Sequence, residues 1–201
     1  MPSFISFFGP IGSGKTARAK LLSDFLHVPL YSELADSPFL QDMFISKRNA
    51  LLNQLHFLYR DRNQILKEYN KKNTKYLIFD YHIAQVDVFS QCFLRKSEYK
   101  LFSTHFTKVM NNIPTPDLII YLYIDQQTNI ARIESRNIDY EKSLTKKDML
   151  LMHTKIKRHL ELIKRKTSVL EIDASKDVIG SLKARLDILE TMISGIASLK
   201  L

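Results

Sequence analysis

The sequence predicts a three-layer α/β domain, in which helices cover both faces of a parallel sheet of five strands. Short apolar segments alternate with longer helical segments along the 201 residues, which is the order typical of βαβ units. A glycine-rich phosphate-binding pattern separates the first apolar segment from the first helical one. Residues 118–124 are almost entirely apolar, as expected of a strand that is buried on both faces.

The expected elements follow one another without repeats or linkers, so residues 1–201 are expected to form a single domain. The strands are expected at residues 3–8, 28–31, 76–80, 118–124 and 168–172. The helices are expected at residues 14–27, over much of 38–70, and at 84–95, 98–111, 128–136, 145–166 and 176–199. Two prolines within residues 113–117 break the chain ahead of the fourth strand.

Residues 9–16 carry the complete pattern G-x-x-x-x-G-K-[ST] between the first strand and the first helix. Its glycines let successive backbone N–H groups turn around a phosphate, and the helix that follows adds unpaired N–H groups. Lys15 can reach the β- and γ-phosphates, and the Thr16 hydroxyl can bind Mg²⁺. A glycine-rich turn without a ligand is the alternative, which the flanking strand and helix disfavour. We therefore expect ATP or another nucleoside triphosphate, with Mg²⁺, to contact Gly9, Pro10, Ile11, Gly12, Ser13, Gly14, Lys15 and Thr16.

The net charge of +9 fits either nucleic-acid binding or a lysine-rich surface around a site for an anionic nucleotide. The basic residues are spread along the chain, and residues 155–166 lack interleaved aromatic side chains on which bases could stack. We therefore do not expect a nucleic-acid partner. The single cysteine, Cys92, excludes an internal disulfide and fits a reducing compartment. No apolar run reaches the roughly 18–20 residues that span a bilayer, and no signal peptide is recognisable, so we expect a cytoplasmic protein without a membrane contact.

Six further segments follow the phosphate loop in a defined order. They are Tyr-Ser-Glu at 31–33, Ser-Pro-Phe-Leu at 37–40, Gln-Leu-His-Phe-Leu at 54–58, Leu-Ile-Phe-Asp at 77–80, Asp-Leu-Ile-Ile-Tyr-Leu at 117–122, and Arg-Ile-Glu-Ser-Arg at 132–136 with Glu141. This ordered set resembles the deoxynucleoside kinases, and within them the short bacterial deoxyadenosine and deoxyguanosine kinases. The resemblance implies a P-loop kinase fold, transfer of the γ-phosphate of ATP to the 5′-hydroxyl of a deoxynucleoside, and a homodimer.

The resemblance implies catalytic roles for Glu33, Lys15, Arg132 and Arg136. Glu33 follows the second strand and could take the proton of the sugar hydroxyl; an exposed loop glutamate is the alternative. Arg132 and Arg136 lie one helical turn apart in a lid of about residues 132–145, where two guanidinium groups could clamp the transferring phosphoryl group. A pair of surface arginines is the alternative.

The remaining expected residues bind the metal and the acceptor. Asp80 ends the third strand and could hold Mg²⁺ together with Thr16, although it could instead cap the next helix. The expected acceptor-binding residues are Gln54, Phe57, Tyr81 and Glu141. An amide can bond a base edge in two places and a phenyl ring can stack on it, whereas a buried Phe beside an exposed Gln is the plainer alternative.

The chain departs from the family pattern mainly on the acceptor side. Tyr81 stands where the family carries an arginine, and Val86 stands where it carries an aspartate. Asp61 takes the place of an arginine in the Gln segment, and Ile138 that of the second lid arginine. Removing these partners predicts weak and poorly selective phosphorylation of deoxynucleosides. Two alternatives stay open: a kinase for another small molecule or a nucleoside monophosphate, and a regulatory nucleotide-binding protein with little turnover.

Overall fold

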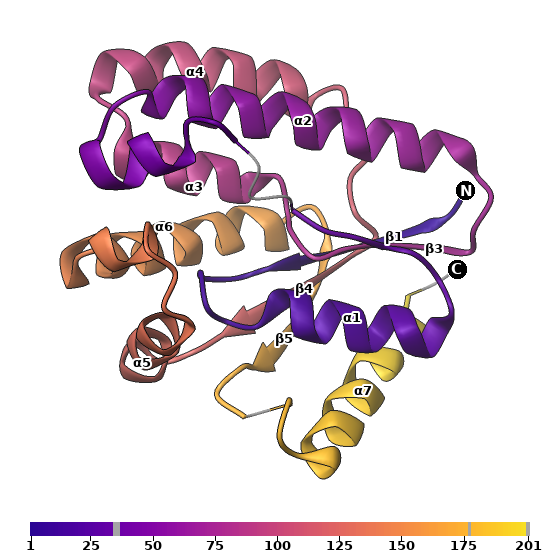
Figure 1. Ribbon diagram of the computed structural model, residues 1–201. Helices are drawn as coiled ribbons and strands as arrows, with labels where there is room; N and C mark the ends of the chain where they lie inside the picture. Colours follow the sequence, from indigo (N-terminus) through magenta and orange to yellow (C-terminus); the bar gives the residue numbers. More distant parts are fainter. Residues whose placement is uncertain (34–36, 177, 200–201) are drawn as a thin grey trace.

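The structure, a computed structural model, describes residues 1–33, 37–176 and 178–199. A five-stranded sheet with the strand order β2-β3-β1-β4-β5 forms its centre (Figure 1). The strands are β1 (Ser3–Phe8), β2 (Leu30–Tyr31), β3 (Tyr76–Phe79), β4 (Leu118–Tyr123) and β5 (Ser168–Asp173). Neighbouring strands pair in parallel throughout, which confirms the expected parallel sheet.

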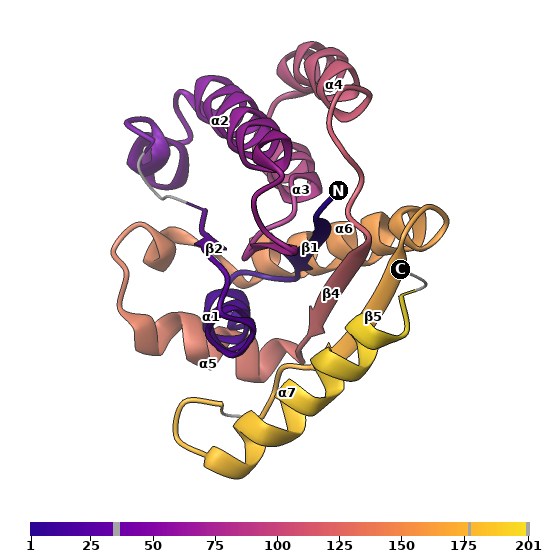
Figure 2. The ribbon, with the colours of Figure 1, turned by 90° about the vertical axis from the view of Figure 1, so that its right-hand side faces the viewer.

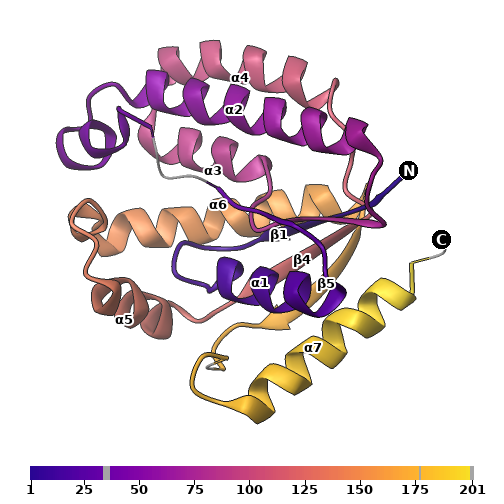
Figure 3. The same ribbon diagram turned by 45° about the vertical axis from the view of Figure 1, so that its right-hand side comes forward.

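Helices cover both faces of this sheet and complete the three layers (Figure 2). One face carries α2 (Ala50–Lys71), α3 (Ala84–Phe93), α4 (Lys96–Met110) and α6 (Lys146–Lys164). The opposite face carries α1 (Lys15–Leu26) and α7 (Leu182–Ala197). The helix α5 (Gln126–Arg136) packs beside α6 near the ends of the strands (Figure 3).

The strand β1 shows why the sequence folds into these layers. All of its residues are buried, and its side chains alternate between the two faces. Ile5 and Phe7 pack in the core below α1 and α7, whereas Phe4 and Phe8 pack toward α2 and α6. The strand therefore holds the phosphate loop that follows it on a support packed from both sides.

Three expected boundaries were wrong. The segment 38–70 is not one helix, because Lys47 and Asn49 adopt left-handed backbone conformations (φ 56° and 53°) between a short π-helix, Asp42–Ser46, and α2. The second strand is limited to two residues. The last helix begins at Leu182, six residues after the expected start, where the Ser181 hydroxyl accepts a hydrogen bond from the backbone N–H of Ala184. None of the helices in the described ranges is both long and apolar enough to cross a membrane.

Candidate active site

A cavity of about 610 Å³ opens beyond the carboxyl ends of β1 and β3, where parallel α/β sheets bind their ligands. The phosphate loop, α2, α3, α5 and the segment before α7 contribute its walls. Most of the expected site residues line it together: Ile11, Gly12, Gly14, Lys15, Thr16, Glu33, Gln54, Phe57, Asp80, Arg132, Arg136 and Glu141. Segments more than a hundred residues apart in the sequence therefore meet around one space.

The backbone of the phosphate loop has the conformations that its glycines allow. Gly12 and Gly14 have φ angles of 75° and 80°, in the region that residues with a Cβ rarely adopt. A Cβ at Gly12 would lie 2.9 Å from the Cγ1 atom of Ile133 on α5, so the loop also packs closely against that helix. Gly14 caps α1, and no described side chain caps this helix end. The first N–H groups of α1 therefore face the cavity side of the loop as donors for an anion.

Lys15 projects into the loop that it follows. Its Nζ atom donates to the carbonyl oxygens of Gly9 and Pro10, both at 2.9 Å. Enclosure by the protein lowers the pKa of Lys15 to about 8, while the carboxylates of Glu33 and Asp80 act in the opposite direction. A phosphate group in the cavity would add negative charge beside the ammonium group and favour its protonated form.

Two residues that the sequence reading missed hold the loop from outside. Arg18 is 1% exposed, and its guanidinium group donates to the carbonyl oxygens of Ser13, Ala174 and Lys176 at 3.3, 3.2 and 2.9 Å. Asn129 on α5 donates from Nδ2 to the carbonyl oxygen of Ile11 at 2.6 Å. An arginine in the first turn of the helix that follows the loop pattern was a signal for Arg18, whereas nothing in the local pattern pointed to Asn129.

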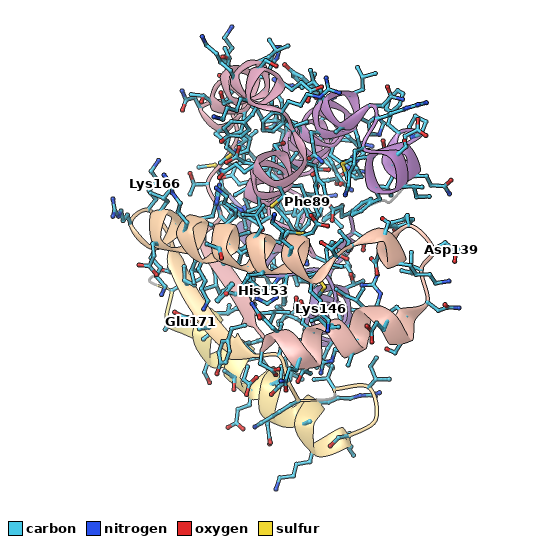
Figure 4. The ribbon with its side chains drawn as sticks, turned by 90° about the vertical axis from the view of Figure 1, so that its left-hand side faces the viewer. Phe89, Asp139, Lys146, His153, Lys166 and Glu171 are labelled. Atoms are coloured by element: carbon cyan, nitrogen blue, oxygen red, sulfur yellow. The ribbon has the colours of Figure 1, made fainter. Side chains whose placement is uncertain are left out.

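Asn129 is itself held in place by α6. The Nε2 atom of His153 lies 2.9 Å from Asn129 Oδ1, and His153 points from α6 toward α5 (Figure 4). Burial lowers the pKa of His153 and so favours its neutral ring. The phosphate loop is thereby connected through α5 to the long helix α6.

The two lid arginines contact different partners in this structure. Arg132 donates to the carbonyl oxygens of Ala174 and Ser175 at 2.6 and 2.8 Å. Arg136 instead lies 3.2 Å from Glu141 Oε1. Both side chains line the cavity, but they do not converge on one point, so the clamp expected from their spacing stays a prediction. Arg132 and Arg18 together bring the segment after β5 next to the phosphate loop.

Glu33 and Asp80 are in direct contact, and the charges of both carboxylates act on Lys15. The backbone N–H of Glu33 donates to Asp80 Oδ1 at 2.9 Å, and Asp80 is 4% exposed. Desolvation raises the pKa of Glu33, the charges of Lys15 and Arg60 lower it, and that of Asp80 raises it. Glu33 is therefore a carboxylate with raised proton affinity beside the phosphate-binding lysine, as a general base requires.

The donors for Mg²⁺ are few but suited to that ion. Thr16 and Asp80 both line the cavity near the phosphate loop. In the described ranges no group of three or more His, Cys, Asp or Glu residues could hold a metal by itself. Mg²⁺ commonly takes only one or two protein ligands and completes its shell with substrate phosphates and water. A hydroxyl and one carboxylate beside a triphosphate site fit this pattern.

The far end of the cavity carries amide side chains with unused hydrogen-bonding capacity. Among the described residues, Gln54 and Asn53 donate to the thioether sulfur of Met43, at 3.0 and 3.1 Å, and sulfur is a weak acceptor. The side-chain carbonyl oxygens of Asn53 and Gln85 are buried and have no partner among the described residues. Buried polar atoms of this kind indicate a polar ligand, with Phe57 as an adjacent aromatic wall. The sequence reading found Gln54 and Phe57 but missed the other two amides.

Tyr81 is the expected acceptor residue that is absent from the described cavity lining. It is 2% exposed, its ring packs edge-on against Phe79, and its hydroxyl donates to Gln64 Oε1 at 2.8 Å. The aromatic ring is more stable in the apolar core between α2 and the sheet than in a polar cavity. Val86 does line the cavity, whereas Asp87 points away from it and lies 2.8 Å from His159 on α6.

Comparisons with known proteins agree on one family. The family model for deoxynucleoside kinases matches residues 5–196. The chain is 28% identical over 145 residues to the deoxyguanosine kinase of Bacillus subtilis, covering 70% of each protein. It is 26% identical over 179 residues to the deoxyadenosine kinase of Dictyostelium discoideum, covering 87% of this chain and 73% of the relative.

Solved structures show the same fold. The deoxyadenosine kinase of M. mycoides with bound dATP superposes with a TM-score of 0.82 at 20% identity, over 97% of this chain and 100% of that one. The same enzyme with bound dCTP gives a TM-score of 0.81, over 97% and 99%. With the family match spanning nearly the whole sequence, the chain belongs to the deoxynucleoside kinase family.

Proposed function

We propose that this chain transfers the γ-phosphoryl group of ATP, or of another nucleoside triphosphate, to the 5′-hydroxyl of a deoxynucleoside. The observation that carries the proposal is that Lys15 and Glu33 line one cavity, with the phosphate loop on one side and unsatisfied amides on the other. Phosphoryl transfer requires charge neutralisation, alignment and a base, and the residues that line this space could supply all three. The names of the relatives make purine deoxynucleosides the first acceptors to test.

In the proposed reaction the 5′-oxygen forms a bond to the γ-phosphorus while the bond from that phosphorus to the β–γ bridging oxygen breaks. The nucleoside diphosphate leaves, and the proton of the hydroxyl passes to the carboxylate of Glu33. Lys15 and the N–H groups at the start of α1 hold the negative charge of the phosphates. Thr16 and Asp80 would hold Mg²⁺, which supplies further charge neutralisation when it is bound.

The lid would act after the triphosphate has bound. Arg132 and Arg136 are engaged with backbone carbonyl oxygens and with Glu141. The greater negative charge of a bound triphosphate is a stronger partner for a guanidinium group than a neutral carbonyl. We propose that residues 132–145 rearrange so that one or both arginines contact the transferring phosphoryl group.

On the acceptor side, Gln54 would bond the base edge and Phe57 would supply the stacking surface. Glu141 is 5% exposed, and its Oε2 atom is buried without a partner among the described residues, so it can accept a hydrogen bond from the acceptor. Tyr81 has no place in this proposal, because its hydroxyl is bonded to Gln64 in the core. The amides of Asn53 and Gln85 take its place beside the base.

The test is a steady-state assay of ADP release over the four common deoxynucleosides, run with Mg-ATP. We expect turnover of at least one of them, with kcat/KM below the ordinary range of about 10⁴–10⁸ M⁻¹s⁻¹ and little selectivity. A thermal-shift series with ATP runs in parallel, because a ligand that binds the folded state raises its stability. Stabilisation by ATP without turnover of any deoxynucleoside would contradict the proposal and favour the nucleotide-binding regulatory protein or another acceptor.

Further parts of the proposal concern the protein as a whole. We propose that residues 1–201 act as one catalytic domain, that two copies form a homodimer, and that the enzyme works in the cytoplasm without a nucleic-acid partner. The reducing compartment suits its single thiol, Cys92. Light scattering coupled to size-exclusion chromatography measures the assembly, and a mass of one chain would contradict the dimer.

A further inference from the structure

Two amide side chains at the acceptor end of the cavity lie outside the segments on which the family resemblance rests. Asn53 precedes the Gln segment on α2, and Gln85 lies in the first turn of α3. They are 0% and 4% exposed, and both line the cavity. Their carbonyl oxygens are buried and have no hydrogen-bond partner within the described part of the chain. Two buried acceptors of this kind are unfavourable unless a ligand donates to them.

The sulfur atom of Met43 determines which way the amide of Asn53 faces. Asn53 Nδ2 donates to this sulfur at 3.1 Å, and the neighbouring Gln54 Nε2 donates to it at 3.0 Å. A thioether sulfur can accept a hydrogen bond but cannot donate one, so it binds the NH₂ group and leaves the Asn53 oxygen for another partner. Met43 also lines the cavity, and its unbranched side chain can shift when a ligand enters.

On α3, Gln85 stands beside a position where the family carboxylate is missing. Val86 replaces the aspartate of the family pattern and adds only apolar surface to the cavity. Asp87 does not take over its role, because its carboxylate points away and lies 2.8 Å from His159. Of the α3 residues that line the described cavity, Gln85, Val86 and Phe89, only Gln85 carries a polar side chain. The hydrogen-bond acceptor on this helix is therefore an amide oxygen one position earlier in the chain.

The common bases differ in what they can donate to two such oxygens. Adenine, cytosine and guanine each carry an exocyclic amino group with two N–H bonds, whereas thymine carries carbonyl oxygens and no amino group. An amino group can satisfy buried acceptors, but the oxygens of thymine would face them and leave them unpaired. A site with buried polar groups rejects a ligand that cannot pair with them more strongly than an apolar pocket does.

We propose that Asn53 and Gln85 select the acceptor base: their carbonyl oxygens accept hydrogen bonds from the amino group of adenine, cytosine or guanine and disfavour thymine. This inference rests on the proposed function, because it takes the acceptor to be a deoxynucleoside. The low selectivity expected of the enzyme then holds among the three amino-bearing bases, and thymine is the exception. Neither side chain takes part in phosphoryl transfer, so replacing them should change the ratios between nucleosides and leave the KM for ATP unchanged.

The first experiment uses pairs of nucleosides that differ in the group at issue. Deoxyadenosine and deoxyinosine differ by the exchange of an amino group for a carbonyl group and its ring proton, and so do deoxycytidine and deoxyuridine. We expect kcat/KM to be at least about tenfold higher for the amino-bearing member of each pair, as for a buried acceptor left without a partner. Ratios below about threefold in both pairs would overturn the inference.

The second experiment compares Gln85→Met, Asn53→Leu and the double variant with the control Gln91→Met. Methionine and leucine keep a similar volume but cannot accept the bond. Gln91 lies on the same helix, donates to Asp87 Oδ2 at 2.8 Å, and is absent from the described lining of this cavity. Each single variant should lower the ratio of deoxyadenosine to deoxyinosine at least about threefold, and the double variant should bring it near one. Gln91→Met should keep the wild-type ratio. Wild-type ratios in all three site variants would overturn the inference, because other groups would then select the base.

Calorimetry of nucleoside binding separates this inference from the proposed function. Preferred binding of the amino-bearing nucleosides without turnover of any of them would contradict the transfer reaction and support the selection of the base. Turnover of both members of each pair at equal kcat/KM would overturn the inference alone. A chain that neither binds nor phosphorylates any nucleoside would overturn both. Should Asn53→Leu fail to fold, the wild-type ratios and Gln85→Met decide.

Discussion

The phosphate-binding region and the acceptor region of the cavity are built in different ways. The phosphate loop is defined by backbone conformation at Gly12 and Gly14, and buried side chains hold its carbonyl oxygens. The acceptor region is defined by side chains of α2 and α3, whose amides, within the described part of the chain, donate to a sulfur atom or keep an unpartnered oxygen. A backbone cradle tolerates few residue types, whereas side-chain contacts can be exchanged between neighbouring positions.

This difference explains where the chain keeps the family pattern and where it departs from it. The loop pattern at 9–16 is complete, whereas the departures fall at Tyr81, Val86 and Asp61, which correspond to acceptor-side positions of the family, and at Ile138 in the lid. If the two regions are as separate as their construction indicates, substitutions in one should leave the function of the other intact. Substitutions made in one region at a time therefore test that separation.

Lys15→Ala should have the largest effect, because it removes the positive charge from the transferring phosphates. We expect kcat/KM to fall by about 10³–10⁵-fold, the range for a cation that acts on this group. The fold should survive, since Lys15 contacts only loop carbonyl oxygens among its described hydrogen-bond partners. Lys20→Ala is the control, as Lys20 lies on the same helix and pairs with Asp24 at 3.1 Å. Unchanged ATP affinity and activity in Lys15→Ala would contradict the phosphate site.

Glu33→Gln should come next and act on the acceptor side alone. The amide has nearly the same shape but cannot take a proton, so we expect kcat to fall by about 10²–10⁴-fold. The affinity for ATP, measured by calorimetry, should change little, because the backbone N–H groups of the loop and Lys15, and not Glu33, bind the phosphates. A kcat within a few-fold of wild type would show that another group accepts the proton, and Glu33 would then be an ordinary loop residue.

Gly12→Ala should damage the phosphate region without touching the acceptor region. The new Cβ would lie 2.9 Å from Ile133 Cγ1, at a φ of 75° that L residues rarely adopt. The strain is worth about 1–3 kcal/mol, which should appear as a lower midpoint of urea unfolding and weaker ATP binding. Gly195→Ala is a matched control on α7, where the Cβ meets Leu170 and the backbone is helical. If Gly12→Ala lowered the affinity for a deoxynucleoside as much as the affinity for ATP, the two regions would be coupled.

The sequence predicted the parallel sheet and the phosphate loop because both are local or periodic features. Continuous apolar runs give the strands, and a glycine pattern gives the loop. Asn129 could not be predicted, since it is defined by its contact with Ile11, far away in the chain. Asn53 and Gln85 were missed because only the folded chain brings them to the wall of the same cavity. The break between Asp42–Ser46 and α2 was missed because a lysine and an asparagine, not a glycine or a proline, adopt the left-handed conformations there.

Tyr81 shows that a site residue cannot be assigned from its position in a family pattern alone. Position 81 belongs to the acceptor site in the family pattern, but a tyrosine there follows its own packing and turns into the core. The replacement therefore removes a cation from the end of β3 without placing the phenol hydroxyl in the cavity.

Tyr81→Phe should have the smallest effect and tests this placement directly. The substitution removes one hydrogen bond, from the Tyr81 hydroxyl to the half-buried Gln64, and leaves the ring packed against Phe79. We expect the free energy of unfolding to fall by about 0.5–1.5 kcal/mol, since water can reach the released amide. The kcat and the KM for the deoxynucleoside should stay within twofold of wild type, because the hydroxyl does not face the cavity. Urea unfolding and steady-state kinetics on the same preparation measure the two effects. A tenfold rise in the KM for the deoxynucleoside at unchanged stability would mean that the hydroxyl contacts the acceptor. The conclusion that the side chain at position 81 belongs to the core and not to the cavity would then be wrong.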